Sequence, residues 1–202
     1  MPARKILCIA SLLWLMLVAA ASAHPVAPLS DAHAWIAGLS HPWSGWDHWL
    51  AMVTVGLFAV QLGGRALWGL PLGFLAGMIV GFGTSWLPLG VPGGVVELAI
   101  ACSVAILGLC VLTAKPATFG LAVVLVTLCG LFHGHAHGTE LPASAAVASY
   151  FLGMVLSTAV LHACGLLIGW SAVRSPAGVW ALRLSGSVVA AAGLMLVLSW
   201  CW

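Results

Sequence analysis

The stretch GGVVELAIACSVAILGLCVLT occupies residues 93–113 and contains one charged residue, Glu97. A helix needs about 20 predominantly apolar residues to cross the hydrocarbon core of a bilayer. This stretch has that length, and its side chains are otherwise apolar or small. It predicts a transmembrane helix.

Five further stretches have the same character. The full set of expected spans is 43–62, 67–88, 93–113, 117–137, 144–170 and 178–200. The segments between them are short and rich in glycine or proline, which end helices. The predicted fold class is therefore all-α: a polytopic membrane bundle of six transmembrane helices, forming a single domain over residues 24–202.

The composition supports a lipid-facing surface. The chain is 63% hydrophobic and 5% charged, whereas roughly a quarter of the residues of a soluble domain are charged. A net charge of +2 without a basic run argues against nucleic acid as a partner. The sequence has no GxxxxGK phosphate loop, so no nucleotide is expected to bind. The expected partner of this surface is a lipid bilayer, and the sequence leaves a homo-oligomer open.

Residues 1–23 have the pattern of a signal peptide. Two basic residues, Arg4 and Lys5, precede an apolar segment at 6–18, and the small residues of 21–23 form a cleavage pattern. Cleavage there would leave His24 as the first residue, with its amine and imidazole as a potential chelating pair. The alternative is an uncleaved anchor helix.

The basic residues predict the orientation. With the mature N-terminus in the periplasm, all basic residues of the mature chain lie on the cytoplasmic side: Arg65, Lys115, Arg174 and Arg183. This distribution follows the positive-inside rule. The expected location is the bacterial inner membrane, crossed several times.

Glycines recur every four residues along the second expected span, at Gly69, Gly73, Gly77 and Gly81. This spacing lays a groove along one helix face, where another helix can approach closely. The alternative is a groove that lines a substrate path.

The segment FHGHAHGTE, residues 132–140, gathers polar side chains at the outer end of the fourth span. On a continuous helix, His133, His137 and Glu140 fall within roughly 60° of one face. His135 then points away, unless a break at a glycine lets all three histidines converge. Imidazole and carboxylate ligands suit Ni²⁺, Co²⁺ and Zn²⁺.

A second polar segment is HPWSGWDHW, residues 41–49. Pro42 can open a helix and would place Asp47 and His48 in its second turn. A carboxylate near the membrane is costly as a free anion, so Asp47 should have a cation or a histidine partner. The same cost applies to Glu97, which either contributes to a cation path or reaches the interface. His162, in the fifth span, is either a further position on that path or a histidine bonded between helices.

Two of these segments resemble the signature motifs of a known family. HPWSGWDHWLAMVTVG, residues 41–56, and FHGHAHGTE look like those of the HupE/UreJ family of bacterial nickel and cobalt permeases. The resemblance implies association with hydrogenase and urease maturation. It also implies that the functional residues of the family fall at His41, Asp47, Glu97, His137 and Glu140.

The leading interpretation is a permease for a divalent transition metal, nickel or cobalt, and not an enzyme. No prosthetic group is expected. The candidate metal ligands are His24, His41, Asp47, His48, Glu97, His133, His135, His137 and Glu140. One alternative is an intramembrane zinc hydrolase that uses Ser44, Asp47 and the His133/His137 pair. Another is a periplasmic metal-binding module without transport.

Overall fold

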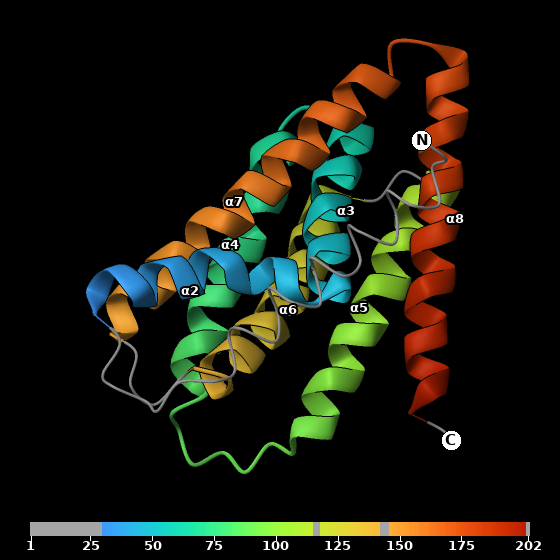
Figure 1. The fold of residues 1–202 in the computed structure, drawn as a ribbon. Coiled ribbons are helices and arrows are strands. Elements are labelled where there is room, and N and C mark those ends of the chain that lie inside the picture. Colours follow the sequence, from blue (N-terminus) through green and yellow to red (C-terminus); the bar gives the residue numbers. More distant parts are fainter. Residues whose placement is uncertain (1–29, 115–117, 142–145, 201–202) are drawn as a thin grey trace, which may run out of the picture.

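The computed structural model describes residues 30–114, 118–141 and 146–200. These residues form seven α-helices and no strand (Figure 1). The helices are α2 (Asp31–Ser44), α3 (Trp46–Leu62), α4 (Ala66–Thr84), α5 (Gly93–Thr113), α6 (Phe119–Thr139), α7 (Val147–Ala172) and α8 (Pro176–Ser199). The expected signal peptide and His24 lie outside the described residues.

Five of the described helices, α4 to α8, are long and apolar enough to cross a membrane. The protein is therefore a multi-pass helical membrane protein. Helix α3 has 17 residues, which makes it about 25 Å long and places it at the lower end of the range for a span. The expected sixth span thus stays a prediction.

The prediction of one helix over 43–62 is wrong at its outer end. Pro42 lies inside α2 and does not open a helix. Gly45, with extended backbone angles, separates α2 from α3, which begins at Trp46. Asp47 and His48 consequently lie in the first turn of α3 and not in the second. Helix α2, which the sequence pattern did not predict, runs across the bundle (Figure 1).

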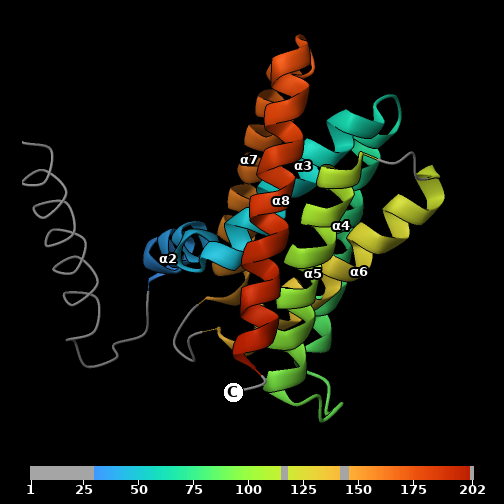
Figure 2. The same ribbon diagram turned by 90° about the vertical axis from the view of Figure 1, so that its right-hand side faces the viewer.

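Three groups of packed helices form the bundle. Helix α4 packs along α6, α5 packs along α8, and α7 packs against both α2 and α3. The α5–α8 pair is seen lengthwise in Figure 2. The buried core between these groups includes Met52, Phe74, Met78 and Met154. These contacts place the start of α3 beside the end of α6.

The predicted glycine groove on α4 is confirmed as a helix-packing surface. A methyl group added at Gly77 would meet the backbone oxygen of Thr127, and one added at Gly81 would meet that of Leu131. Gly130 and Gly134 of α6 face the backbone of α4 in the same way. Because both helices present glycines, their backbones approach closely.

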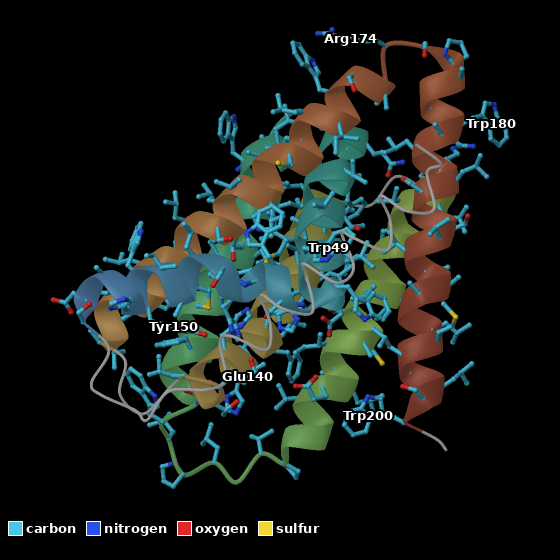
Figure 3. All side chains as sticks on the ribbon, viewed as in Figure 1. Trp49, Glu140, Tyr150, Arg174, Trp180 and Trp200 are labelled. Atoms are coloured by element: carbon cyan, nitrogen blue, oxygen red, sulfur yellow. The ribbon has the colours of Figure 1, made fainter. Side chains whose placement is uncertain are left out.

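The ends of the bundle differ in charge. Arg174, between α7 and α8, lies at the end of the bundle opposite to Glu140 (Figure 3). Arg65 stands in the turn between α3 and α4, where its guanidinium lies 4.9 Å from the ring centroid of Phe119. The histidine-rich and arginine-bearing ends are thus separated, as the sequence pattern indicated.

Gly77→Ala should destabilise the α4–α6 contact, because its methyl group has no space against the α6 backbone. We expect a loss of about 1–3 kcal/mol in the free energy of unfolding, the usual cost of overpacking. The measurement is unfolding by SDS in mixed micelles, followed by circular dichroism.

Gly83→Ala is the matched control, since a methyl group at this position of α4 meets nothing within 4 Å. It should leave stability unchanged or slightly raise it, because alanine favours helix. Equal stability of the two variants would contradict the close packing at Gly77.

Candidate metal centre

The candidate site lies where the end of α2, the start of α3 and the end of α6 meet. His41 belongs to the last turn of α2, and Asp47 and His48 belong to the first turn of α3. The break at Gly45 lets these two helices diverge, so their ends present side chains to the same region. Helix α6 continues without a break to Thr139, which is the condition for His133, His137 and Glu140 to share one face.

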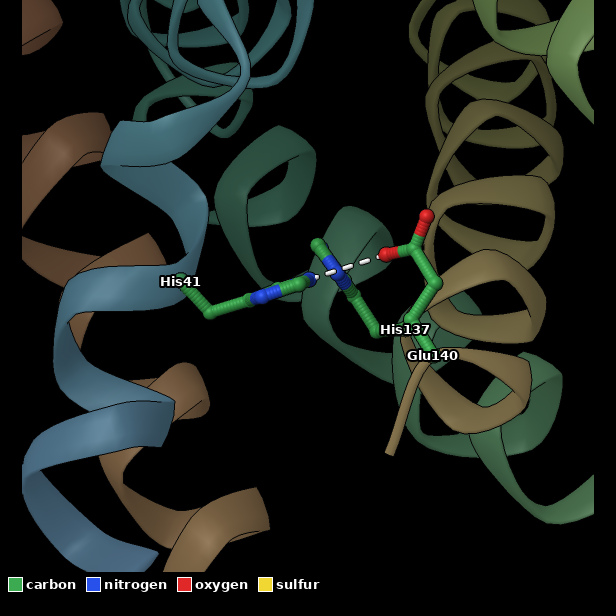
Figure 4. Close-up of side chains that lie close together, drawn as sticks. All are labelled: His41, His137 and Glu140. Carbon is green, nitrogen blue, oxygen red and sulfur yellow. Dashed lines mark hydrogen bonds and ion pairs between the residues drawn. The ribbon is translucent and has the colours of Figure 1, made fainter. Parts of the chain in front are cut away.

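Three side chains form a compact group of donor atoms. His41, His137 and Glu140 each offer one ligand atom, and these atoms lie within 4.8 Å of one another. The His41 Nε2 and the Glu140 Oε2 are 3.0 Å apart, and the His41 and His137 rings have centroids 4.7 Å apart. Figure 4 shows the His137 ring beside the line that joins the other two side chains. A cation could replace the proton shared by His41 and Glu140.

A histidine–carboxylate pair adjoins this group. The Nδ1–H of His48 donates to the Asp47 Oδ1, at 2.8 Å, and the backbone N–H of His48 donates to the same oxygen. Asp47 therefore has the histidine partner that its place near the membrane predicted. With its proton at Nδ1, the neutral His48 ring carries its lone pair at Nε2. That atom is buried and has no hydrogen-bond partner in the described part of the chain. A carboxylate commonly orients metal-binding histidines in this way.

His133 is fixed by the backbone of its own helix. Its Nδ1 lies 2.8 Å from the carbonyl oxygen of Cys129. A carbonyl oxygen only accepts, so Nδ1 carries the proton and Nε2 is the free acceptor. That Nε2 is buried, and no residue that the structure describes forms a hydrogen bond with it. The His48 and His133 ring centroids are 5.2 Å apart, so the two free nitrogens belong to neighbouring rings.

His137 is the least satisfied side chain of the group. It is fully buried, and neither ring nitrogen has a hydrogen-bond partner among the described residues. Leaving a buried polar group unpaired costs about 1–3 kcal/mol. The ring lies between His41 and His48, with centroid distances of 4.7 and 4.8 Å. A bound cation would satisfy one of its nitrogens.

Carboxylates supply negative charge around these rings. The hydrogen bond from His41 is the main reason that the pKa of Glu140 lies below its ordinary value of 4.5, so this residue is an anion at neutral pH. Glu97, on α5, interacts electrostatically with Glu140, His48 and Asp47. It forms no hydrogen bond or ion pair with any residue in the described part of the chain. Three of the four acidic residues thus act on one region.

His135 lies apart from this group. Its Nδ1 is 3.2 Å from the Thr84 Oγ1, on α4. The Thr84 hydroxyl donates to the Gly81 carbonyl, so its oxygen accepts from His135. The structure therefore brings together His41, Asp47, His48, His133, His137 and Glu140, with Glu97 nearby and His135 turned toward α4.

Tyr150 is a neighbour that the sequence reasoning missed. Its ring centroid lies 5.7 Å from that of His41, and its buried hydroxyl has no hydrogen-bond partner among the described residues. The available signal was its rarity, since it is the only tyrosine of the chain. Its position in the first turn of α7 places a neutral hydroxyl beside the donor group.

A cavity of about 200 Å³ opens onto the donor group. It is lined by His41, Ser44, Gly45, His48 and Glu140. The Ser44 hydroxyl donates to the His41 carbonyl at 2.6 Å. A cavity of this size holds a hydrated ion and is smaller than the sites that enclose drug-sized molecules.

Fold and site together define a class: a multi-pass helical membrane protein with a buried cluster of imidazoles and carboxylates near one end of the bundle. The sequence model of the HupE / UreJ protein family matches residues 12–196. The chain is also 42% identical over 166 residues to Protein HupE of Rhizobium leguminosarum bv. viciae, covering 80% of this chain and 83% of that protein. No solved structure matches significantly.

The chain therefore belongs to the HupE/UreJ family, as the two motifs indicated. This is a family of hydrogenase and urease accessory proteins related to nickel and cobalt transport. The match extends over nearly all of the described helices.

His137→Ala should weaken the binding of Ni²⁺ to the purified protein at least tenfold, because it removes a central donor ring. His135→Ala should change the affinity less than threefold, since that ring is bonded to Thr84. Even the loss of a residue that only orients a metal ligand lowers metal affinity tenfold or more. Isothermal titration calorimetry in detergent measures both, and equal losses would contradict the unbroken end of α6.

Proposed function

We propose that this protein carries a divalent transition metal cation, nickel or cobalt, across the bacterial inner membrane. One observation supports this most strongly. The buried Nε2 atoms of His48, His133 and His137 have no hydrogen-bond partners among the described residues, and their rings are consecutive neighbours beside two carboxylates. A cation is the partner that such an arrangement lacks.

The donor set favours a borderline cation. Neutral imidazole nitrogens with carboxylate oxygens suit Ni²⁺, Co²⁺ and Zn²⁺, whereas Cu(I) favours cysteine or methionine sulfur. Family membership supports nickel or cobalt over zinc. Here the ion is the transported substrate and not a resident cofactor, and no prosthetic group is part of the proposal.

The charges of the site suit the capture of a hydrated dication. Two carboxylates, Asp47 and Glu140, lie beside the imidazoles and match the charge of one divalent ion. His41 and Glu140 are partly exposed, so they meet the ion first. His137 and His133 are fully buried, so deeper binding requires the loss of water ligands. Imidazole nitrogens would replace those waters stepwise.

The membrane potential can drive this movement. A dication that moves inward through a potential of 100 mV gains about 4–5 kcal/mol, at about 2.3 kcal/mol per unit charge. Facilitated or secondary transport would then need no nucleotide, which agrees with the lack of a phosphate loop in the sequence. The imported metal would supply the maturation of hydrogenase or urease.

The proposed topology places the metal centre on the periplasmic side. It includes cleavage of the signal peptide after Ala23, six spans with α3 as the first, and Arg65 and Arg174 on the cytoplasmic side. The separation of the arginines from Glu140 supports this orientation through the positive-inside rule.

The zinc hydrolase is not favoured. A hydrolase acting on lipid amides would need an acyl pocket next to the metal, whereas the cavity at the donor group measures about 200 Å³. The Ser44 hydroxyl donates to the His41 carbonyl, so its proton is not directed to a histidine base. Family membership likewise points to transport or an accessory role.

Asp47→Asn should lower nickel uptake at least tenfold, because it removes a charge that offsets the cation and weakens the orientation of His48. The measurement is uptake of radiolabelled Ni²⁺ into proteoliposomes with an inside-negative potential. Asp31→Asn is the matched control, because Asp31 is exposed and lies at the far end of α2. Normal uptake by Asp47→Asn would refute the proposed path.

Uptake should fall as the pH is lowered, because protons compete with the cation for the lone pairs of the imidazole rings and a protonated ring cannot bind a metal. Glu140 would not cause this decline. Its pKa is lowered by the hydrogen bond from His41, so its charge is present above pH 4.5 and is lost only at lower pH. A decline confined to pH values below 4.5 would assign the dependence to carboxylates instead. The initial rate of uptake against pH measures this.

A further inference from the structure

His162 is a buried histidine that the metal centre does not use. It lies on α7, is 2% exposed, and belongs to the part of the helix that leads toward Arg174. Its Nδ1 is 2.7 Å from the backbone oxygen of Met52, on α3. Its Nε2 is buried and has no hydrogen-bond partner among the described residues.

The bond to Met52 determines which nitrogen of His162 is free. A carbonyl oxygen accepts and does not donate, so the proton of the neutral ring is at Nδ1. Nε2 therefore carries the lone pair. This is the same arrangement as in His133, where a backbone carbonyl also takes the Nδ1 proton. Leaving this buried nitrogen unpaired costs free energy, which a ligand at Nε2 would offset.

A continuous series of rings links His162 to the metal centre. Phe74, on α4, contacts both histidines: its ring centroid is 5.3 Å from that of His133 and 5.0 Å from that of His162. His133 in turn neighbours His48 at 5.2 Å. The series thus runs from the partly exposed His41 through rings of α6, α3 and α4 to the middle of α7.

The surroundings of His162 differ from those of the outer group. Thr158, one turn earlier on α7, is buried. Its hydroxyl donates to the Met78 sulfur, with 3.6 Å between the oxygen and the sulfur. No described acidic residue forms a hydrogen bond or ion pair with His162. The possible ligand atoms near this position are therefore an imidazole nitrogen, a hydroxyl oxygen and the Met78 sulfur, and none of them is an anion.

We infer that His162 forms a second, inner binding position for the transported cation, which the ion reaches from His133 past the Phe74 ring. The inference rests on the proposed transport function. The absence of a carboxylate bonded to His162 suits a position of transit, because conduction requires sites that bind strongly enough to receive an ion and weakly enough to release it. The outer group captures the ion, and the neutral inner position passes it on.

Two substitutions separate metal binding from helix pinning. His162→Gln keeps an N–H that can donate to Met52 but replaces the imidazole lone pair by an amide oxygen, which is a poorer ligand for these ions. His162→Met has no N–H for Met52 and offers a thioether sulfur, which suits Cu(I) better than Ni²⁺ or Co²⁺. If His162 binds the cation, both variants should lose Ni²⁺ uptake, the glutamine variant without a lowered melting temperature. If His162 only pins α7 to α3, the glutamine variant should keep uptake and the methionine variant should lose it.

The experiment uses the full-length protein in proteoliposomes with radiolabelled Ni²⁺. We expect His162→Gln to lower the rate of uptake at saturating nickel at least tenfold. Equilibrium binding of Ni²⁺ to the outer group, measured by calorimetry on the same preparation, should stay within twofold of wild type. Ser157→Ala is the matched control, because it removes another hydrogen bond of α7, the partly buried one from the Trp43 indole to the Ser157 hydroxyl, and leaves the ring series intact.

The outcomes are distinct. Uptake like wild type in His162→Gln would overturn the inner position while leaving the proposed function intact. Loss of uptake in both variants together with a lowered melting temperature would also overturn it, in favour of a structural bond. No uptake of Ni²⁺ or Co²⁺ by the wild-type protein would refute the proposed function itself.

Discussion

Ionisable side chains inside a membrane protein must find partners, because water is scarce there and an unpaired polar group is costly. In three histidines of this protein, one ring nitrogen has a hydrogen-bond partner and the other has none among the described residues. The Nδ1 protons of His133 and His162 bind backbone carbonyls, and that of His48 binds Asp47. The opposite nitrogens are left as acceptors. In the proposed function, a passing cation would satisfy them, and only while it is bound.

The close contact between α4 and α6 orients this set of acceptors. Gly130, Gly134 and Gly138 of α6 lie on the face that packs against α4. At about 100° per residue, His133 and His135 stand on opposite sides of Gly134. One side turns to α3 and the candidate metal centre, where His48 lies. The other side reaches Thr84 on α4. The glycine stripe therefore decides which histidines can share an ion.

Charge is distributed unevenly along the proposed path. Carboxylates stand beside the outer rings, where a hydrated dication must exchange water for protein ligands. His162 has no acidic partner in the described chain, and its neighbours are Phe74 and the backbone of Met52. In the proposed path, the outer carboxylates attract the cation strongly and the inner position holds it weakly. The membrane potential would then set the direction in which the cation moves. The same arrangement would keep an ion from being held permanently.

The sequence by itself determined that the surface of the protein faces lipid, and it placed five of the spans to within a few residues. It also determined the glycine groove and the shared face of His133, His137 and Glu140. Hydropathy and helical periodicity are local properties, so they can be read from neighbouring residues. Only the tertiary structure decided that α2 ends at Ser44, that His135 faces α4, and that His41 meets Glu140, 99 residues away. It alone also connected His162 to His133 through Phe74. Such contacts depend on how distant helices pack, and that packing leaves no periodic pattern along the chain.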